Sequence, residues 1–313
     1  MLSFTFALCL EAQYYEAMRY RAIPTFRSVG AVLFAAAAMF FLPALMHAEP
    51  LVFASYPFGD PVRVQRGLSP LVEYLSAATG TPMRLVVTRD YQELSRRLGD
   101  GTVDFAWIGS ANYARTRISV PSIQYIATYL EWDRDRTERI SFYRAVILAR
   151  ADSDFETLES LRGTRFGFTD RDSTAGYAYP RMMLTTAGFD YAEFFRSVFF
   201  LGTHENVIRA LLAGSLDAGA VSDGTLLNAQ TEHGDRFRVL AWSPPIPLDA
   251  VIAAEHVPPA LVTAVRNVLV ALPPDHPVHD AIERVFGWPA AGFNVMPESF
   301  YEPVFRALEL RDR

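Results

Sequence analysis

The sequence has no lysine and only one cysteine, Cys9, among its 313 residues. A disulfide within the chain is therefore excluded, and so is the phosphate-binding loop Gly-x-x-x-x-Gly-Lys of nucleotide-binding proteins. The charge is mildly acidic, with 35 Asp and Glu against 29 Arg, and no block of basic residues occurs. We therefore expect no nucleic-acid partner. The apolar share of 50% is ample for a packed core.

Common enzyme motifs are also missing. The sequence lacks Gly-x-Ser-x-Gly, His-Glu-x-x-His and a redox-active cysteine pair, which are signatures of hydrolases, zinc proteases and oxidoreductases. We therefore predict that the chain is not an enzyme and has no catalytic residue, no cofactor and no metal site. One alternative stays open, in which Ser173 and His204 meet as a nucleophile and its base in a hydrolase.

The N-terminal part resembles an export signal. Basic residues precede an apolar run over residues 30–45, and Ala48 offers a small residue at which a signal peptidase could cut. This pattern predicts a signal peptide over residues 1–48, of which residues 1–17 read as an upstream extension. The alternative is an uncleaved membrane anchor, because the apolar run is nearly long enough to span a bilayer.

The rest of the chain contains one arrangement of strands and helices twice. In the first copy, residues 51–54 form an apolar strand, a helical pattern of apolar residues ends at Gly80, and further elements lead to a strand ending at residue 108. The second copy begins with a strand at residues 165–168 and ends near residue 221. Alternating strands and helices predict an α/β protein with two lobes. Ligands of such sheets bind beyond the carboxyl ends of the strands.

Two strands are expected to carry the chain between the lobes, one at residues 143–149 and one at residues 237–242. The predicted boundaries are residues 49–143 plus 243–313 for lobe 1 and residues 144–242 for lobe 2. Two crossings make a hinge, and hinged lobes can close around a ligand.

One segment is suited to binding an anion. Asp172-Ser173-Thr174-Ala175-Gly176 lies directly after a predicted strand and opens a helix, which Asp172 or Ser173 can cap. The first N–H groups of a helix lack partners within it and carry partial positive charge. Together with the two hydroxyl groups, they predict an oxyanion site. The alternative is an ordinary helix cap with nothing bound.

Five motifs, in order along the chain, resemble the phosphate, phosphite and phosphonate substrate-binding proteins of ABC importers. Those proteins carry Ser-Thr-Ser-Gly followed by an aromatic residue. The resemblance covers about residues 50–255 and implies a two-lobed type II periplasmic-binding-protein fold with two hinge crossings. The five motifs are Tyr143-Arg144-Ala145-Val146, Ser173-Thr174-Ala175-Gly176-Tyr177, Gly202-Thr203-His204-Glu205, Leu216-Asp217-Ala218-Gly219-Ala220 and Ser243-Pro244-Pro245-Ile246-Pro247-Leu248-Asp249.

The resemblance also implies a ligand pocket between the lobes. Ser173, Thr174 and the N–H groups of residues 174–176 would hold the oxygens of a phosphonate, phosphite or phosphate. His204 would donate to an oxygen, and Asp249 would accept from a protonated P–OH group. The implied ligand-binding residues are Tyr56, Tyr143, Ser173, Thr174, Ala175, His204 and Asp249.

Each of these residues also has a structural alternative. His204 could be a surface residue at a helix start, Asp249 could bond its own loop, and the two tyrosines could serve only in packing. The sequence also departs from the family pattern at two positions. Ala175 stands where the family often has a second serine. In members that bind aminoalkylphosphonates, an acidic residue meets the ligand amine, but the matching position here is Gly224, next to Asp223. This departure argues against an aminoalkyl ligand and leaves a simpler anion open.

The function implied by the resemblance is solute capture. The chain would be a monomeric periplasmic subunit that closes around its oxyanion and presents it to an ABC permease in the inner membrane. The alternative is a periplasmic sensory or accessory protein that signals to a membrane partner.

Overall fold

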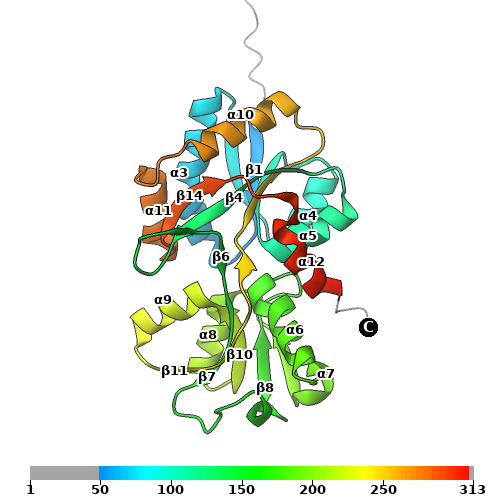
Figure 1. Cartoon of the computed structure of the whole chain (residues 1–313), viewed down its shortest axis with the longest axis vertical. Helices are drawn as coiled ribbons and strands as arrows, with labels where there is room; N and C mark the ends of the chain where they lie inside the picture. Colours follow the sequence, from blue (N-terminus) through cyan, green and yellow to red (C-terminus); the bar gives the residue numbers. More distant parts are fainter. Residues whose placement is uncertain (1–48, 310–313) are drawn as a thin grey trace, which may run out of the picture. The chain divides into compact units, whose positions relative to one another are not determined.

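The structure, a computed structural model, describes residues 49–309. The predicted signal peptide, residues 1–48, lies outside the described residues, so its cleavage stays a prediction. Within the described range, no helix is both long and apolar enough to cross a membrane. The same range forms two main sheets, each covered by helices (Figure 1).

The first sheet combines early and late parts of the chain. Across it the strands are β14 (Ala290–Asn294), β4 (Gln124–Trp132), β13 (Ala250–Ala253), β3 (Phe105–Ile108), β1 (Leu51–Ser55) and β2 (Met83–Val87), and β5 (Arg139–Ile140) pairs with β4. Strand β1 is parallel to β2 and β3, whereas β13 is antiparallel to β3 and β4. The chain therefore leaves this sheet after β4 and β5 and returns to it at β13.

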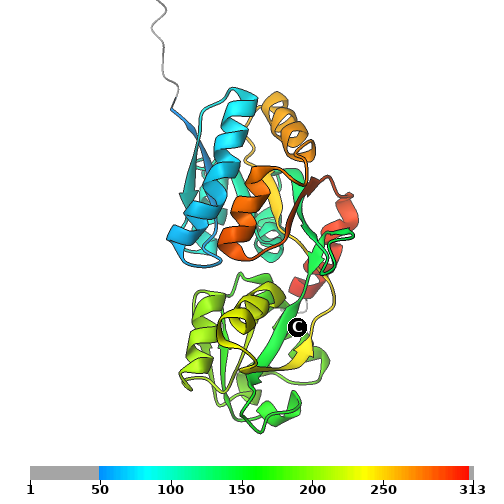
Figure 2. The ribbon, with the colours of Figure 1, turned by 90° about the vertical axis from the view of Figure 1, so that its left-hand side faces the viewer.

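Helices α3 (Pro61–Thr79) and α11 (Pro277–Phe286) pack against each other beside the first sheet (Figures 1 and 2). Gly67 permits this contact, because a Cβ atom there would lie 2.2 Å from the ring of Phe286. Helix α3 ends at Gly80, whose φ of 65° is in the left-handed region that glycine adopts without steric cost. The other helices of this part are α4 (Tyr91–Gly99), α5 (Ser110–Ser119), α10 (Pro259–Val270), η3 (Glu298–Tyr301) and α12 (Glu302–Glu309).

The second sheet is formed by the middle of the chain. Its strands, in order, are β11 (Phe237–Trp242), β7 (Ala145–Arg150), β10 (Ala218–Ser222), β8 (Arg165–Phe168) and β9 (Ser197–Phe200). Helices flank it on both sides (Figure 1), and a separate apolar cluster lies under each group of helices. One group is α8 (His204–Leu212) and α9 (Asp223–His233), and the other is η2 (Thr174–Ala178), α6 (Tyr179–Thr186) and α7 (Tyr191–Phe194), with η1 (Glu159–Leu161) before β8.

The chain passes between the two sheets twice, and the two passages pair with each other. Strand β6 (Phe142–Tyr143) is antiparallel to β12 (Ile246–Pro247). Next to this pair, the Ser243 hydroxyl oxygen accepts the N–H of Ala145 at 2.8 Å. The paired passages therefore form a two-stranded connection between the sheets.

The two passages lie close to the predicted crossings, with a shift in position. The strands at residues 145–150 and 237–242 belong to the second sheet as β7 and β11, and the connection itself is made at residues 142–143 and 246–247. The predicted lobe boundaries, between residues 143 and 144 and between 242 and 243, stay a prediction.

Candidate functional site

Asp249 lies between β12 and β13 and is 7% exposed. Its Oδ2 atom accepts two side-chain hydrogen bonds, from the Tyr56 hydroxyl at 2.5 Å and from Trp107 Nε1 at 2.8 Å. These donors come from the end of β1 and from β3, so the first sheet fixes the carboxyl group. Burial raises the pKa of the Asp249 carboxyl above its usual value, and the two hydrogen bonds offset only part of that rise. Both hydrogen bonds of the Asp249 carboxyl group thus come from the first sheet and not from the loop that carries Asp249.

His204 is the first residue of α8 and is 8% exposed, so it is not a surface residue. Its Nδ1 atom accepts the N–H of Ser222 at 3.1 Å. A backbone N–H can only donate, so the proton of the neutral ring must be on Nε2. Burial lowers the pKa of His204 to about 4, which keeps the ring neutral near pH 7. The Nε2–H group is therefore a fixed neutral donor.

Ser173, rather than Asp172, caps the helical segment that follows β8. Its hydroxyl oxygen accepts the N–H of Gly176 at 3.0 Å and lies 3.5 Å from Nε2 of His204. The segment starts with a π-helical turn, η2, and its first N–H groups, at Thr174 and Ala175, have no acceptor within the turn. The predicted helix start is thus present, and the Ser173 hydroxyl at this start lies beside Nε2 of His204.

Thr174 connects this turn to the first sheet. Its hydroxyl oxygen accepts the N–H of Ala111 at 2.8 Å and lies 3.4 Å from the Ser110 hydroxyl, both at the start of α5. Nearby, Arg115 of α5 forms an ion pair with Asp172. Elements of the two sheets are therefore bonded directly to each other around the predicted site.

A small pocket, here called the inner pocket, brings most of the predicted residues together. Its volume is about 70 Å³, which is room for about two water molecules. Tyr56, Tyr143, His204 and Asp249 line it, whereas Ser173, Thr174 and Ala175 do not, although Ser173 approaches it through His204. The other lining residues are Phe58, Tyr129, Glu131, Ser222, Asp223, Gly224, Thr225, Leu248 and Trp288.

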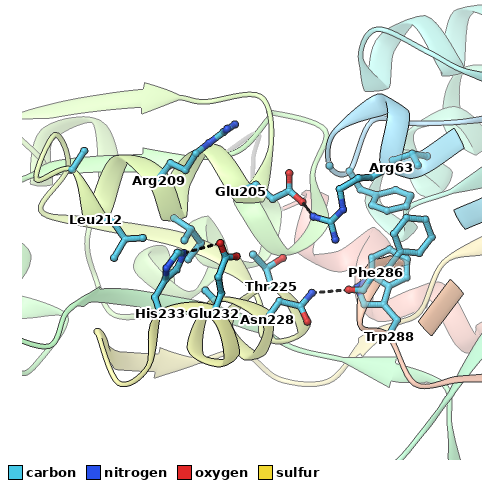
Figure 3. A pocket seen from close by; sticks show the side chains of 16 residues that line it. Arg63, Glu205, Arg209, Leu212, Thr225, Asn228, Glu232, His233, Phe286 and Trp288 are labelled. Carbon is cyan, nitrogen blue, oxygen red and sulfur yellow. Dashed lines mark hydrogen bonds and ion pairs between the residues drawn. The ribbon is translucent and has the colours of Figure 1, made fainter. Parts of the chain in front are cut away.

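A larger groove of about 660 Å³ lies next to the inner pocket and shares Phe58, Thr225 and Trp288 with it. Two contacts between the sheets span this groove (Figure 3). Arg63 of α3 pairs with Glu205 of α8 at 2.7 Å, and the Asn228 amide of α9 donates to the Phe286 carbonyl at 2.6 Å. Elements of both sheets therefore meet across the larger groove, next to the inner pocket.

Sequence reasoning missed several residues of the inner pocket. Glu131 and Tyr129 lie on the same face of β4, because alternate residues of a strand point to the same side. Burial raises the pKa of Glu131 to about 8, and the charges of Asp223 and Asp249 add to this rise. Burial also raises the pKa of Asp223 to about 6. The available signal was an acidic residue inside a largely apolar strand.

The raised pKa of Glu131 predicts a pH-dependent stability. The pKa of Glu131 is 4.5 in the unfolded chain and about 8 in the folded protein. Its contribution to the free energy of unfolding is therefore fully present below pH 4.5 and is lost as pH rises through about 8. His204 works in the opposite sense, since its contribution is lost as pH falls from 6.5 towards about 4. Above pH 6.5, the free energy of unfolding should therefore fall towards pH 8. Urea denaturation should show a flatter decline for Glu131→Gln, and equal declines would contradict the assignment.

Gly176 is needed because η2 approaches the end of β8 closely. A Cβ atom at this position would lie 1.8 Å from Oγ1 of the buried Thr169. We expect Gly176→Ala to lower the free energy of unfolding by about 1–3 kcal/mol, which is typical of an overpacked core. Thermal and urea denaturation measure this loss. Adding Thr169→Ala, which removes the nearest atom, should recover part of it, and a double variant as unstable as Gly176→Ala would argue against the clash.

Relatives identified by sequence cover part of the chain. Phosphate-import protein PhnD of Mycolicibacterium smegmatis is 24% identical over 194 residues, or 60% of this chain and 59% of that protein. A probable ABC transporter phosphite binding protein, PhnD1, of Prochlorococcus marinus is 26% identical over 155 residues, or 49% of this chain and 46% of that protein. The match thus spans about half the length of these curated relatives.

Solved structures show the same fold over more of the chain. PhnD1 from Prochlorococcus marinus in complex with methylphosphonate has a TM-score of 0.72 at 18% identity and covers 83% of this chain and 98% of that one. A binding protein component of an ABC phosphonate transporter from Pseudomonas aeruginosa has a TM-score of 0.73 at 16% identity, with coverages of 84% and 87%. The predicted type II periplasmic-binding-protein fold is therefore confirmed.

A family model extends the similarity to most of the sequence. The model is described as "ABC transporter, phosphonate, periplasmic substrate-binding protein", and it matches residues 53–296. The matched range includes both sheets except the first two residues of β1, Leu51 and Val52. All seven predicted ligand-binding residues fall within it. The chain belongs to this family of periplasmic phosphonate substrate-binding proteins of ABC transporters.

Proposed function

We propose that this protein is the extracytoplasmic solute-binding component of an ABC importer and that its ligand is a phosphorus oxyanion, namely a phosphonate, phosphite or phosphate. The family description and the names of the relatives support the transporter role. The observation that carries the ligand class is the pairing of a neutral donor, Nε2–H of His204, with a buried carboxyl group, Asp249, in one small pocket.

This donor and acceptor set suits a partly protonated oxyanion. A phosphonate monoanion has oxygen atoms that accept hydrogen bonds and one P–OH group that donates. His204, Ser173 and the free N–H groups of η2 supply donors, and Asp249 supplies an acceptor. A fully deprotonated anion such as sulfate would place negative charge beside Asp249 without offering it a proton, so the pocket should discriminate against it.

Capture requires the two sheets to separate and close. The paired strands β6 and β12 form the connection about which they would move. The contacts of Thr174 with Ala111 and of Arg63 with Glu205 join the sheets across the site, and opening would break them. The closed form would then be presented to a permease in the inner membrane by a monomeric periplasmic protein.

The hydrolase alternative has little support from the geometry. A base for Ser173 would need a free lone pair on Nε2 of His204, but Nδ1 accepts the Ser222 N–H, so Nε2 carries the proton. The family description is likewise that of a substrate-binding protein. Both points favour binding without catalysis.

Titration calorimetry with phosphate, phosphite, methylphosphonate and sulfate tests the proposal. We expect at least one phosphorus oxyanion to bind, and sulfate to bind at least about tenfold more weakly, which corresponds to about 1.4 kcal/mol. Binding of none of the three phosphorus oxyanions would refute the ligand class. Sulfate binding as tight as the others would refute the role assigned to Asp249.

A further inference from the structure

A third pocket, here called the tyrosine pocket, lies in the part of the chain that contains the first sheet. Its volume is about 470 Å³, and small-molecule sites have volumes of about 300–1,000 Å³. Helices α5, α10 and α12, the start of β4 and residues 296–297 line it, and α5 contacts α12 (Figure 1). None of the described residues that line it belongs to the second sheet or its helices. The tyrosine pocket is therefore separate from the inner pocket and does not depend on closure around it.

Two arginines that line the tyrosine pocket bond to the start of β4. Arg117 Nη1 donates to the Ile123 carbonyl at 2.7 Å. Arg266 donates through Nη2 to the Tyr125 carbonyl at 2.8 Å and through Nε to the Ile126 carbonyl at 3.1 Å. Residues two apart in a strand lie about 7 Å from each other. The two guanidinium groups are thus held beside neighbouring positions of one strand.

The positive charges of these arginines are not balanced by ion pairs. Neither Arg117 nor Arg266 forms an ion pair with any described residue. Of the described residues that line the pocket, Glu302 alone is acidic, and its side chain is exposed at the start of α12. A guanidinium group has five N–H donors, so both arginines keep donors that no carbonyl group accepts. Their fork geometry matches carboxylate and phosphate groups.

Aromatic rings form a second part of the lining. The ring centroid of Tyr113 lies 4.9 Å from that of Tyr301 and 6.3 Å from that of Tyr125. Tyr125 and Tyr301 are 6.1 Å apart, so the three rings make one continuous wall. Tyr125 and Phe305 are only half-buried, and both line the pocket. Aromatic side chains pack favourably against another flat ring.

We propose that the tyrosine pocket is a second binding site, which takes a small aromatic dianion. The two acidic groups of this ligand accept N–H bonds from Arg117 and Arg266, and its ring packs against the tyrosine wall. The exposed carboxylate of Glu302 lies at the same pocket and opposes the bound charge. This inference is independent of the proposed function, because no residue of the inner pocket takes part in it.

Three small probes test the chemical class of the ligand. Benzene-1,3-dicarboxylate has an aromatic ring and two carboxylates. Benzene-1,3-dicarboxamide has the same number of heavy atoms but no charge, and glutarate keeps the three-carbon spacing of the carboxylates but has no ring. In calorimetry at pH 7, we expect the aromatic dicarboxylate to bind at least about tenfold more tightly than the diamide, as expected for hydrogen bonds between charged groups. Glutarate should bind more weakly than the aromatic dicarboxylate.

The same titrations can overturn the proposal. No binding of benzene-1,3-dicarboxylate, or equal binding of the diamide, would refute the anion site. Equal binding of glutarate would refute the contribution of the aromatic wall.

Variants locate the probe in the tyrosine pocket. Arg117→Gln and Arg266→Gln should each weaken binding of benzene-1,3-dicarboxylate by about tenfold or more. Arg84→Gln, which alters an exposed arginine outside the pocket, should leave it unchanged. Glu302→Gln should strengthen binding by about twofold to fivefold, the range of a solvent-exposed charge interaction. Unchanged affinity in both arginine variants would refute their assignment.

The gain expected from Glu302→Gln does not depend on the arginine variants folding. Both arginines also bond carbonyl groups of the strand region, so their replacement can lower stability. Glu302 is exposed, and thermal denaturation of its variant should match that of the wild type. If Glu302→Gln binds the probe no more tightly than the wild type does, the probe is not held in this pocket.

Methylphosphonate separates this site from the inner pocket. At a saturating concentration, methylphosphonate should not displace benzene-1,3-dicarboxylate, and displacement would place the probe in the inner pocket and overturn the proposal. If none of the phosphorus oxyanions binds but the aromatic dicarboxylate does, with the expected response to the variants, the proposed function fails and the second site stands.

Discussion

Asp249→Asn is expected to reverse the preference of the pocket for protonated over deprotonated ligands. Oδ2 of Asp249 accepts both the Tyr56 hydroxyl and Trp107 Nε1. The amide oxygen of asparagine can accept the same two bonds, and the amide nitrogen then replaces Oδ1. An acceptor for P–OH becomes a donor, and a negative charge is lost.

The affinity for methylphosphonate should fall by about tenfold to a hundredfold, in line with the loss of a charged hydrogen bond. The affinity for sulfate should be higher in Asp249→Asn than in the wild type. Calorimetry on wild type and variant at one pH measures both changes. Asp154→Asn, at an exposed position, serves as the matched control. If selectivity between the two anions is unchanged in Asp249→Asn, Asp249 is not in contact with the ligand.

His204→Asn is expected to fold but to bind weakly. The asparagine side-chain oxygen can occupy the place of Nδ1 and accept the Ser222 N–H, while no donor remains at the place of Nε2. Losing one hydrogen bond to a charged ligand should weaken binding of a phosphorus oxyanion by about tenfold to 150-fold.

His204→Gln provides the complementary test. Glutamine is longer, so its amide nitrogen can reach the place of Nε2 and donate to the ligand, while the Ser222 N–H loses its acceptor. We expect this variant to bind more tightly than His204→Asn and to be less stable, because an unsatisfied buried donor costs about 1–3 kcal/mol. Calorimetry and thermal denaturation of both variants check this. The opposite order of affinities would remove Nε2 from the site.

Local features of the site were predictable from the sequence. The helical segment after β8 depends on neighbouring residues, and the capping pattern predicts it with Asp172 or Ser173 as the cap, of which the structure has Ser173. The α/β fold likewise follows from the alternation of strands and helices. These features need no information about distant parts of the chain.

Long-range contacts were not predictable in the same way. Asp249 meets Tyr56 across 193 positions and Trp107 across 142 positions of sequence. The family resemblance implied Tyr56 as a ligand-binding residue. Nothing in the sequence of β3 indicated that Trp107 would donate a hydrogen bond to Asp249. Glu131 was not identified from the sequence, because its place in the pocket depends on how β4 faces the second sheet.

The tryptophans at the inner pocket have a consequence for how binding can be observed. Trp107 donates to the carboxyl group of Asp249, and Trp288 lines both the inner pocket and the larger groove. Indole emission depends on the polarity and charge around the ring, so a ligand entering this pocket changes the surroundings of both chromophores. The protein therefore carries its own optical reporter, and kinetics of capture can be followed by intrinsic fluorescence without a label.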